Sequence, residues 1–213
     1  EKADQKQSAP ATEALRGDGE VTAADDAPAD RIEEEKTELQ KTVSVTTLVE
    51  GNNRFALDML KHVGSGDVAY SPYGVTLAGL MLRAGADGTT AEQLDATFRV
   101  QLQEGTLDSK VKTLRENIDH GAERGFDPGV VRHVWMDETV TLQNAFSRRA
   151  LDGYSSTVEL ASFSSDQQAR GTIDDAMAVA TSSVITGITG EYALGSRTFA
   201  VAVGATPRGS WAV

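Results

Sequence analysis

The side chains best suited to chemistry in this chain are the histidines His62, His120 and His133 and the serine Ser71. A metal site needs several rings at one point, and these histidines lie far apart in the sequence, so helix ends or the surface are the better interpretation. Ser71 with a distant histidine would supply a nucleophile and a base. A serine directly before Pro72, at the start of an apolar run, is more typical of a helix cap.

The common catalytic motifs are missing from the sequence. It has no cysteine, no G-x-S-x-G, no H-E-x-x-H, no P-loop and no G-x-G-x-x-G after a strand. The paired carboxylates of "DDAPAD" and "TIDDAM" fit a solvated tail and a helix face, and EF-hand spacing is absent. We therefore predict a protein that is not an enzyme and that needs no cofactor or metal ion.

A small basic cluster is formed by Lys110, Lys112 and Arg115, with Glu116 and Asp119 beside it. The whole chain has a formal net charge of −12, so it has no general attraction for nucleic acid or for anionic lipid. No apolar run reaches the roughly 18 residues that a membrane span needs. Ordinary surface charge is the better interpretation of the cluster, and we predict neither nucleic acid binding nor membrane insertion.

The first part of the chain differs in composition from the rest. Residues 1–44 are rich in Ala, Asp, Glu and Pro and hold no aromatic residue, which predicts a disordered acidic tail or tether. Within it, Asp30 to Lys41 could form a short solvated helix. Residues 45–213 are predicted to form the globular part. A hydrophilic tail suits a secreted or surface-tethered protein, although a cytoplasmic location stays open, and the lack of an initiator Met suggests a removed leader or a start within a longer protein.

Hydrophobic periodicity predicts a series of helices. One covers "NNRFALDMLKHV" with Asn52 or Asn53 as its cap, and a buried one follows Ser71 and ends at Gly85. The next is expected to begin with a capping box at Thr89–Glu92 or Thr90–Gln93. Three more helices are predicted in "LDSKVKTLRENIDHG", "LQNAFSRRALDGY" and "SDQQARGTIDDAMAVATSSVI".

Short strands are predicted between these helices. They cover "VAY", "GVVRHVWMD", "STVELASF" and "RTFAVAVGA", the last apolar on both faces, as in a strand inside a covered sheet. Trp135 and Trp211 are predicted to belong to the core. Helices that alternate with strands fit either a wound α/β sheet or a mixed α+β sheet, and periodicity does not choose between them.

The order of elements and several segments resemble the N-terminal half of a serpin, the family of serine protease inhibitors. The resemblance runs from about Asn52 to the end of the chain, and its signature positions are partly eroded. The segments that carry it are "DVAYSPYGVTLAGLMLRAGADGTTAEQL", "VRHVWMDETVTLQNAFSRRALDGYSSTVELASF", "DQQARGTIDDAMAVATSSVI" and "RTFAVAVGATPRGSWAV". The resemblance implies an α+β fold, incomplete here, with helices packed on a central mixed β-sheet.

Four positions depart from the family pattern. Gly74 stands where a second serine is usual, and Gly204 where the strand usually holds an asparagine whose side chain ties the buried helix to the sheet. Ala176 replaces a tryptophan, and "TSSVI" replaces a Thr-Asn-Gly turn. The framework for sheet opening that the resemblance implies consists of Ser71, Pro72, Gly74, Thr198, Gly204 and Trp211.

The family's mechanism is implied by the same resemblance. A protease cleaves an exposed bait loop, and the loop then inserts as a new strand into the large sheet and distorts the attached protease. The resemblance ends at Trp211, before any bait loop, so the reactive bond is not in the chain and we expect the chain as given to be truncated and inactive. A non-inhibitory serpin-like binding module and an unrelated α/β enzyme domain are the alternatives.

The implied partner of the complete protein is a serine or cysteine protease. The isolated chain is expected to leave the apolar strand "FAVAVGA" with an unpaired edge. Such an edge is a template for pairing with another chain. We therefore expect residues 1–213 to self-associate through the edge of the sheet.

Overall fold

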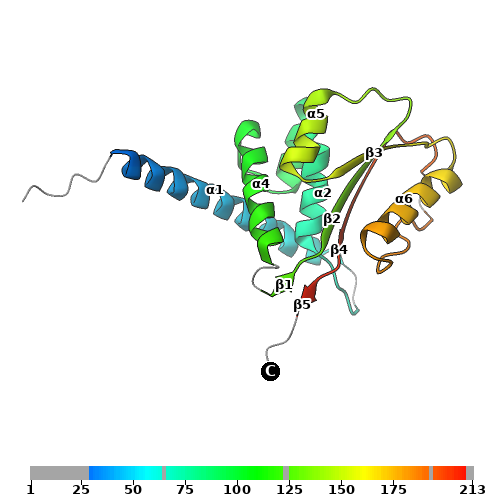
Figure 1. The fold of residues 1–213 in the computed structure, drawn as a ribbon, viewed down its shortest axis with the longest axis horizontal. Helices are drawn as coiled ribbons and strands as arrows, with labels where there is room; N and C mark the ends of the chain where they lie inside the picture. Colours follow the sequence, from blue (N-terminus) through cyan, green and yellow to red (C-terminus); the bar gives the residue numbers. More distant parts are fainter. Residues whose placement is uncertain (1–28, 64–65, 122–124, 192–193, 210–213) are drawn as a thin grey trace, which may run out of the picture. The chain divides into compact units, whose positions relative to one another are not determined.

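The computed structural model describes residues 29–63, 66–121, 125–191 and 194–209 (Figure 1). Of the predicted disordered tail, residues 1–28 lie outside this part, whereas residues 29–44, which include the short helix considered at Asp30 to Lys41, lie within a helix. The helices and strands are α1 (Ala29–Leu60), α2 (Pro72–Ala84), α3 (Gly88–Thr97), α4 (Glu104–Asp119), β1 (Phe126–Asp127), β2 (Val130–Asp137), α5 (Asn144–Arg148), the π-helical turn η2 (Arg149–Gly153), β3 (Thr157–Ala161), α6 (Asp166–Ala180), β4 (Phe199–Ala205) and β5 (Arg208–Gly209).

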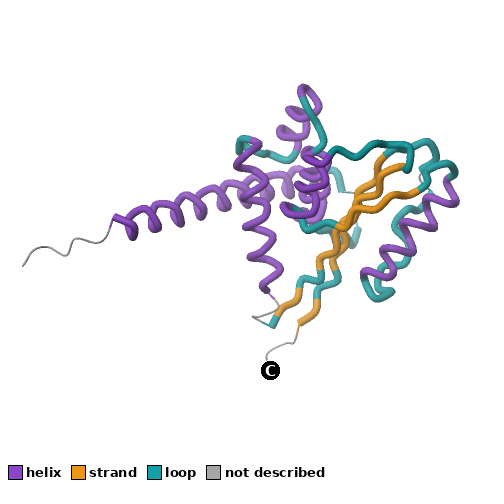
Figure 2. Tube along the Cα trace, turned by 45° about the horizontal axis from the view of Figure 1, so that its top comes forward, coloured by secondary structure: helices purple, strands orange, loops and turns teal. Residues whose placement is uncertain are grey.

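The central sheet has three strands in the order β3-β2-β4. β2 pairs with β3 in parallel and with β4 antiparallel, so the sheet is mixed. Figure 2 shows the strands together in one narrow layer among the helices. The short strands β1 and β5 pair with each other as a separate antiparallel ribbon. The expected α+β fold, with helices packed on a central mixed sheet, is therefore confirmed.

The two faces of the sheet are covered by different helices, with α2 on one side and α6 on the other (Figure 1). Each face forms its own apolar cluster because side chains alternate along a strand. The cluster on the α2 face includes Leu77, Leu80, Met81, Val134, Met136 and Tyr154, with Phe199, Val201 and Val203 of β4 against it. The cluster on the α6 face includes Trp135, Ala161, Phe163, Ala169, Ile173 and Met177, with Ala200 and Ala202 of β4 against it.

Helix α2 begins as the sequence predicts. Ser71 has an extended backbone, its Oγ accepts a hydrogen bond of 3.1 Å from the N–H of Gly74, and Pro72 takes the first helical position. Gly85 ends the helix, and its N–H donates to the carbonyl of Leu82 at 3.1 Å. Leu77 and Met81 are buried, as the apolar run predicts. The helix expected at the most distinctive segment of the sequence is therefore confirmed.

Helix α1 is longer than the periodicity predicts. It runs continuously from Ala29 to Leu60, so Asn52 lies within the helix and the predicted cap at Asn52 or Asn53 is wrong. No proline interrupts this stretch. Gly51 is explained by packing, because a Cβ there would lie 2.6 Å from the carbonyl oxygen of Arg99. A division into two compact units falls after Thr37. The boundary between tail and domain at residues 44 and 45 stays a prediction.

Two further local predictions are wrong. "VAY" forms no strand, because no neighbouring strand pairs with it in the part of the chain that the structure describes; instead Tyr70 Oη donates to the carbonyl of Ala56 at 3.1 Å. Helix α3 is capped by Asp87 and not by a threonine. The Asp87 carboxylate accepts the N–H of Gly88 at 2.7 Å, and Gly88 has a φ of +54°, in the left-handed region that glycine adopts readily.

The other elements follow the sequence closely. Helices α4 and α6 and strands β2, β3 and β4 lie where they are predicted, and Ser165 caps α6 by accepting the N–H of Gln168 at 3.3 Å. The helix predicted in "LQNAFSRRALDGY" is α5, which widens into η2. Trp135 is fully buried, in agreement with its predicted place in the core, whereas Trp211 lies outside the described residues.

The turn after α6 explains why the family pattern Thr-Asn-Gly matters there. Ser182 and Ser183 have φ values of +52° and +62°, in the left-handed region that glycine and asparagine tolerate best. Thr181 is buried, and its Oγ1 donates to the carbonyl of Met177 at 2.7 Å. The threonine therefore keeps its structural place, while the two serines hold a strained backbone.

Ser183→Gly is expected to stabilise the protein by up to about 1 kcal/mol, because glycine removes the cost of the left-handed conformation. Urea unfolding of the two proteins measures the change. Ser109→Gly in helix α4, where the backbone is helical, is the matched control and should lose about 0.5–1 kcal/mol. Equal losses at both positions would contradict this explanation of the turn.

Candidate functional site

Strand β4 carries the feature that stands out most in the structure. One of its edges pairs with β2 over its whole length, from Phe199 opposite Met136 to Ala205 opposite Val130. No strand pairs with its other edge among the described residues. An unpaired edge presents a row of backbone N–H and C=O groups to any extended segment that approaches it.

The face of β4 towards α2 is apolar at the point where the family pattern expects polar groups. A Cβ at Gly74 would lie 3.7 Å from Val203 Cγ1 and 3.4 Å from Ser71 Oγ, so the start of α2 lies directly against the strand. The structure thus brings Ser71, Pro72 and Gly74 together beside β4. The contact between helix and strand is made by a glycine and a valine.

Gly204 does not face α2, so the expectation that it occupies the helix-facing position is wrong. It points to the opposite side, where a Cβ would lie 2.8 Å from Met177 Cε and 3.1 Å from Ile185 Cδ1. Strand alternation explains this: Val203 faces the helix, and its neighbour must face away. Gly204 therefore permits the close approach of α6 to the sheet, and Val203 is the residue that sequence reasoning missed.

Thr198 lies directly before β4, and its carbonyl accepts the N–H of Asp137 at 3.0 Å. The Asp137 carboxylate accepts the N–H of Phe163 at 3.0 Å and is also bonded by the hydroxyl and N–H of Thr139. The hydrogen bonds from Thr139, followed by that from Phe163, hold the pKa of Asp137 below its usual range. Asp137 thus ties the start of β4 to the connection between β3 and α6.

Two aspartates of α6 hold the loop that leads from this helix back to β4. Asp166 accepts the N–H groups of Gly195 and Leu194, and these bonds lower the pKa of its carboxyl. Asp174 accepts the N–H groups of Ile188 and Thr189 at 2.9 and 3.1 Å. Burial raises the pKa of Asp174, but these bonds and that from the Thr189 hydroxyl outweigh it, so the pKa is lowered. Both carboxylates therefore fasten the loop to α6.

His133 is buried in the sheet beneath α6. Its ring stacks on Trp135 with centroids 5.2 Å apart, and its Nδ1 has no hydrogen-bond partner among the described residues. It lies opposite Ala202 of β4 and Thr157 of β3. Burial lowers the pKa of His133, and the nearby carboxylate of Glu159 opposes this only in part. A neutral imidazole is therefore part of the packing between sheet and helix.

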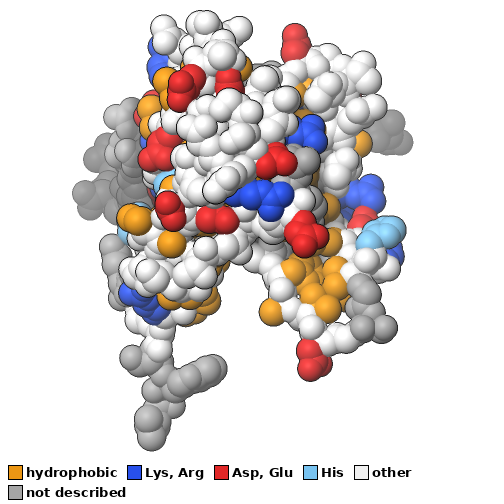
Figure 3. All heavy atoms as spheres, turned by 90° about the vertical axis from the view of Figure 1, so that its right-hand side faces the viewer, with side chains coloured by type: hydrophobic (Ala, Val, Ile, Leu, Met, Phe, Trp, Pro, Cys, Tyr) orange, Lys and Arg blue, Asp and Glu red, His pale blue; other side chains and the backbone are white. Residues whose placement is uncertain are grey.

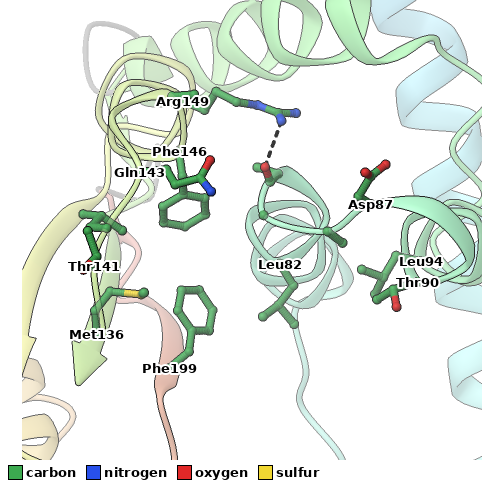
Figure 4. Close-up of a pocket in the computed structure, with 15 residues that line it drawn as sticks. Leu82, Asp87, Thr90, Leu94, Met136, Thr141, Gln143, Phe146, Arg149 and Phe199 are labelled. Carbon is green, nitrogen blue, oxygen red and sulfur yellow. Dashed lines mark hydrogen bonds between the residues drawn. The ribbon is translucent and has the colours of Figure 1, made fainter. Parts of the chain in front are cut away.

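A pocket of about 990 Å³ opens at the start of β4 (Figure 4). Leu82 and Phe199 stand on opposite walls, with Phe146 and Met136 beside Phe199. Asp87 lies at the far side of α2. Because Phe199 is the first residue of β4, the pocket lies at one end of the strand whose outer edge is unpaired.

A polar network stabilises the wall of the pocket that is formed by the end of α2. Arg149 donates to the carbonyl of Ala84 at 2.8 Å, at the end of α2 (Figure 4). It also forms an ion pair of 2.7 Å with Asp108. Tyr154 Oη donates to the carbonyl of Leu80 at 3.1 Å, and burial raises the pKa of this tyrosine. These bonds satisfy carbonyls at the end of α2 and fix the helix against α4 and η2.

The other residues that might do chemistry are explained by local structure. Ser71 is a cap, and His120 Nδ1 lies 2.6 Å from the carbonyl of Glu116 at the end of α4. Arg115 pairs with Glu116 and Asp119. Figure 3 shows acidic and basic side chains interspersed on the side that α6 covers. In the described part of the chain, no cluster of histidine, aspartate and glutamate has the arrangement of a metal site.

The arrangement is suited to binding an extended segment. β4 offers an unpaired backbone edge between two helices, and the pocket at its first residue offers apolar surface. This is the geometry in which a strand is added to a sheet.

Of the helices in the described ranges, none combines the length and apolar character that crossing a bilayer requires.

Comparison with known protein families places the chain clearly. The family model described as serpin (serine protease inhibitor) matches residues 50–212. A search among curated protein sequences found no match.

Solved structures of serpins share the fold. An Arabidopsis serpin in its native stressed conformation is 18% identical with a TM-score of 0.67, and covers 80% of this chain and 44% of its own. Ovalbumin from emu is 17% identical with a TM-score of 0.70, and covers 78% of this chain and 47% of its own. A tumour-suppressing serpin is 17% identical with a TM-score of 0.66. This chain spans less than half the length of the serpins it resembles.

Gly74→Ala and Gly204→Ala are expected to change stability in opposite directions. At Gly74 an added Cβ meets only ordinary contacts within a helix, so alanine should stabilise by about 0.5 kcal/mol. At Gly204 it must displace the buried Met177 and the partly buried Ile185, so alanine should cost about 1 kcal/mol. Urea unfolding measures both, and a gain at Gly204 would contradict the close packing of α6 on β4.

Stability should fall as the pH drops below about 6.5, because the lowered pKa of His133 means that the unfolded chain takes up the proton first. The loss should be below about 1.4 kcal/mol per pH unit and end at the folded pKa. Chemical unfolding between about pH 7.5 and about pH 5.5 measures it, above the range in which the aspartates and glutamates of the unfolded chain titrate. His133→Phe should remove this slope and the control His62→Gln should keep it; the same slope in His133→Phe would contradict the assignment.

Proposed function

Because the chain belongs to the serpin family, we propose that the complete protein is a serpin-type inhibitor of serine or cysteine proteases. Serpins are mostly protease inhibitors and not enzymes, and some are non-inhibitory. Inhibition would follow the family's route, in which the protease cleaves a bait loop and the loop inserts as a strand into the sheet. The described residues would supply the receiving part of that sheet, while the bait loop and its reactive bond would lie elsewhere in the protein.

The observation that carries this proposal is the unpaired edge of β4 between α2 and α6. Insertion needs an edge whose N–H and C=O groups are available, with apolar helices to cover the new strand on both faces. Phe199, Val201 and Val203 would extend the apolar layer under the new strand on the α2 side. Ala200 and Ala202 are small and leave the other side to α6 and its return loop.

A non-inhibitory binding module is the second candidate, and the Gly74–Val203 contact favours it. In the family, polar side chains at this junction join the buried helix to strands that must part. Here a glycine and a valine meet, so the junction lacks the side-chain hydrogen bonds that would be exchanged during insertion. A sheet that lacks these side-chain hydrogen bonds could keep the serpin fold while the protein serves to bind a partner.

Three finer features belong to the same proposal. The tail of residues 1–44 would be a tether ahead of a domain that begins at residue 45. The protein would be secreted or held at the cell surface, which suits a hydrophilic tether. The framework of Ser71, Pro72, Gly74 and Thr198 would position β4, with Val203 in the helix-facing place predicted for Gly204; Trp211, its last predicted member, lies outside the described residues.

Incubation of the complete protein with a panel of serine and cysteine proteases tests the proposal. An inhibitor of this type should form a covalent complex that survives boiling in SDS, because the acyl linkage is trapped when the loop inserts. Heat-denatured protein is the control. Cleavage of the protein without any such complex would contradict inhibition and favour the binding module.

Residues 1–213 alone are expected to self-associate through β4. Ala205 lies at the exposed end of this strand, so Ala205→Lys should weaken association about fivefold or more by placing charge at the edge. Leu160→Lys on β3, at the opposite edge of the sheet, is the matched control. Sedimentation at several concentrations measures both. A monomeric wild-type chain, or equal weakening by both lysines, would contradict association through β4.

A further inference from the structure

We propose that a small cavity between helices α1, α2 and α4 binds one water molecule, which joins Asn52 of α1 to Tyr73 and Thr76 of α2. The proposal does not depend on the proposed function, because it concerns the side of α2 that faces away from β4. It adds a polar contact that holds the start of α2 against α1.

The cavity lies where the three helices pack together, and it has room for one water molecule. Most of the residues that line it are apolar, and the polar ones are Asn52, Tyr73 and Thr76. The centre of a water molecule can occupy about 10 Å³ of this space, close to the smallest volume that holds one water. None of the described residues in the lining is charged, so the cavity does not suit an ion.

The oxygens of these three polar side chains have no hydrogen-bond partner among the described residues. Asn52 Oδ1, Tyr73 Oη and Thr76 Oγ1 are all buried, and Thr76 as a whole is only 4% exposed. A buried polar atom without a partner destabilises a protein, and natural proteins pair nearly all such atoms, with ordered water where no protein atom reaches. Three of them around one cavity therefore indicate a bound water, which typically makes about three hydrogen bonds.

The three groups are chemically complementary to water. Asn52 Oδ1 only accepts, so the water donates to it, whereas the two hydroxyls both donate and accept. Carbon atoms form the accessible surface of the cavity, so small side-chain rotations bring the oxygens onto the water. Arg132 lies close to Tyr73 without the geometry of a hydrogen bond. Burial raises the pKa of Tyr73 and outweighs this nearby charge, so the hydroxyl keeps its proton and can donate it.

The cavity lies on the side of α2 that faces away from the sheet. Tyr73 and Thr76 are three residues apart and therefore share one face of the helix. Gly74, which lies against Val203 of β4, comes two residues before Thr76 and so points roughly 200° away from it around the helix axis. The hydrogen bonds that fix α2 to α4 and η2 lie at the other end of α2. The water therefore holds the end of α2 that these bonds do not reach.

Urea unfolding of residues 1–213 distinguishes a bound water from unpaired oxygens. Thr76→Val and Tyr73→Phe each remove one hydroxyl and nearly keep the shape of the side chain. If the hydroxyls bind a water, each variant should lower the urea midpoint by about 0.5 M. If they are unpaired, each should raise it, because the variant removes a buried polar group that has no partner. Thr97→Val, whose exposed hydroxyl donates to the carbonyl of Gln93 at 2.7 Å, is the matched control and should change the midpoint less.

A high-resolution crystal structure of the same chain locates the water directly. One water should lie within about 3.2 Å of Asn52 Oδ1, Tyr73 Oη and Thr76 Oγ1. Thr76→Ser keeps a hydroxyl and should keep the water, whereas Thr76→Val should remove its bond to α2 at this position. An empty cavity, or oxygens that bond directly to one another, would overturn the proposal. A rise of the urea midpoint in both Thr76→Val and Tyr73→Phe would overturn it as well.

Discussion

The structure depends on the alternation of side chains along β4. Phe199, Val201 and Val203 pack towards α2, and Ala200, Ala202 and Gly204 towards α6, so one short strand joins both apolar clusters. Burial of this strand on both faces holds the two helices on the sheet. Like the outer edge of β3, the outer edge of β4 pairs with no strand in the described part of the protein and still offers backbone hydrogen bonds. The packing of the fold and the proposed function thus both depend on β4.

The two sides of β4 are built differently, and the difference matters for movement. On the α2 side the helix is fixed at its end by Arg149 and Tyr154, which bond its carbonyls. On the α6 side, side-chain oxygens of Asp166 and Asp174 fasten the return loop to the helix. The α6 side depends on exposed or partly exposed carboxylates, whereas the α2 side depends on the buried Tyr154 and the partly buried Arg149. We therefore expect α6 and its loop to release the sheet before α2 does.

Most of the fold could be predicted from the sequence, because local signals decide it. Ser71 before Pro72 sets the start of α2, and Ser165 that of α6. The strand "VAY" failed because a strand needs a partner that three residues do not specify. The facing of Gly204 failed for another reason: "FAVAVGA" is apolar on both faces, so its pattern cannot say which residues point to which helix. The pocket at Phe199 joins four separate segments, and no single stretch of sequence announces it.

Amide hydrogen exchange, resolved by residue along β4, tests the central claim most directly. At concentrations where residues 1–213 are monomeric, amides that donate to β2 should exchange slowly, and those between them should exchange fast, because they face the open edge. Alternation of fast and slow amides from Phe199 to Ala205 is the result that the account predicts. Uniform protection would mean that the edge is covered, and uniform fast exchange would mean that β4 is not part of the sheet; either would contradict it.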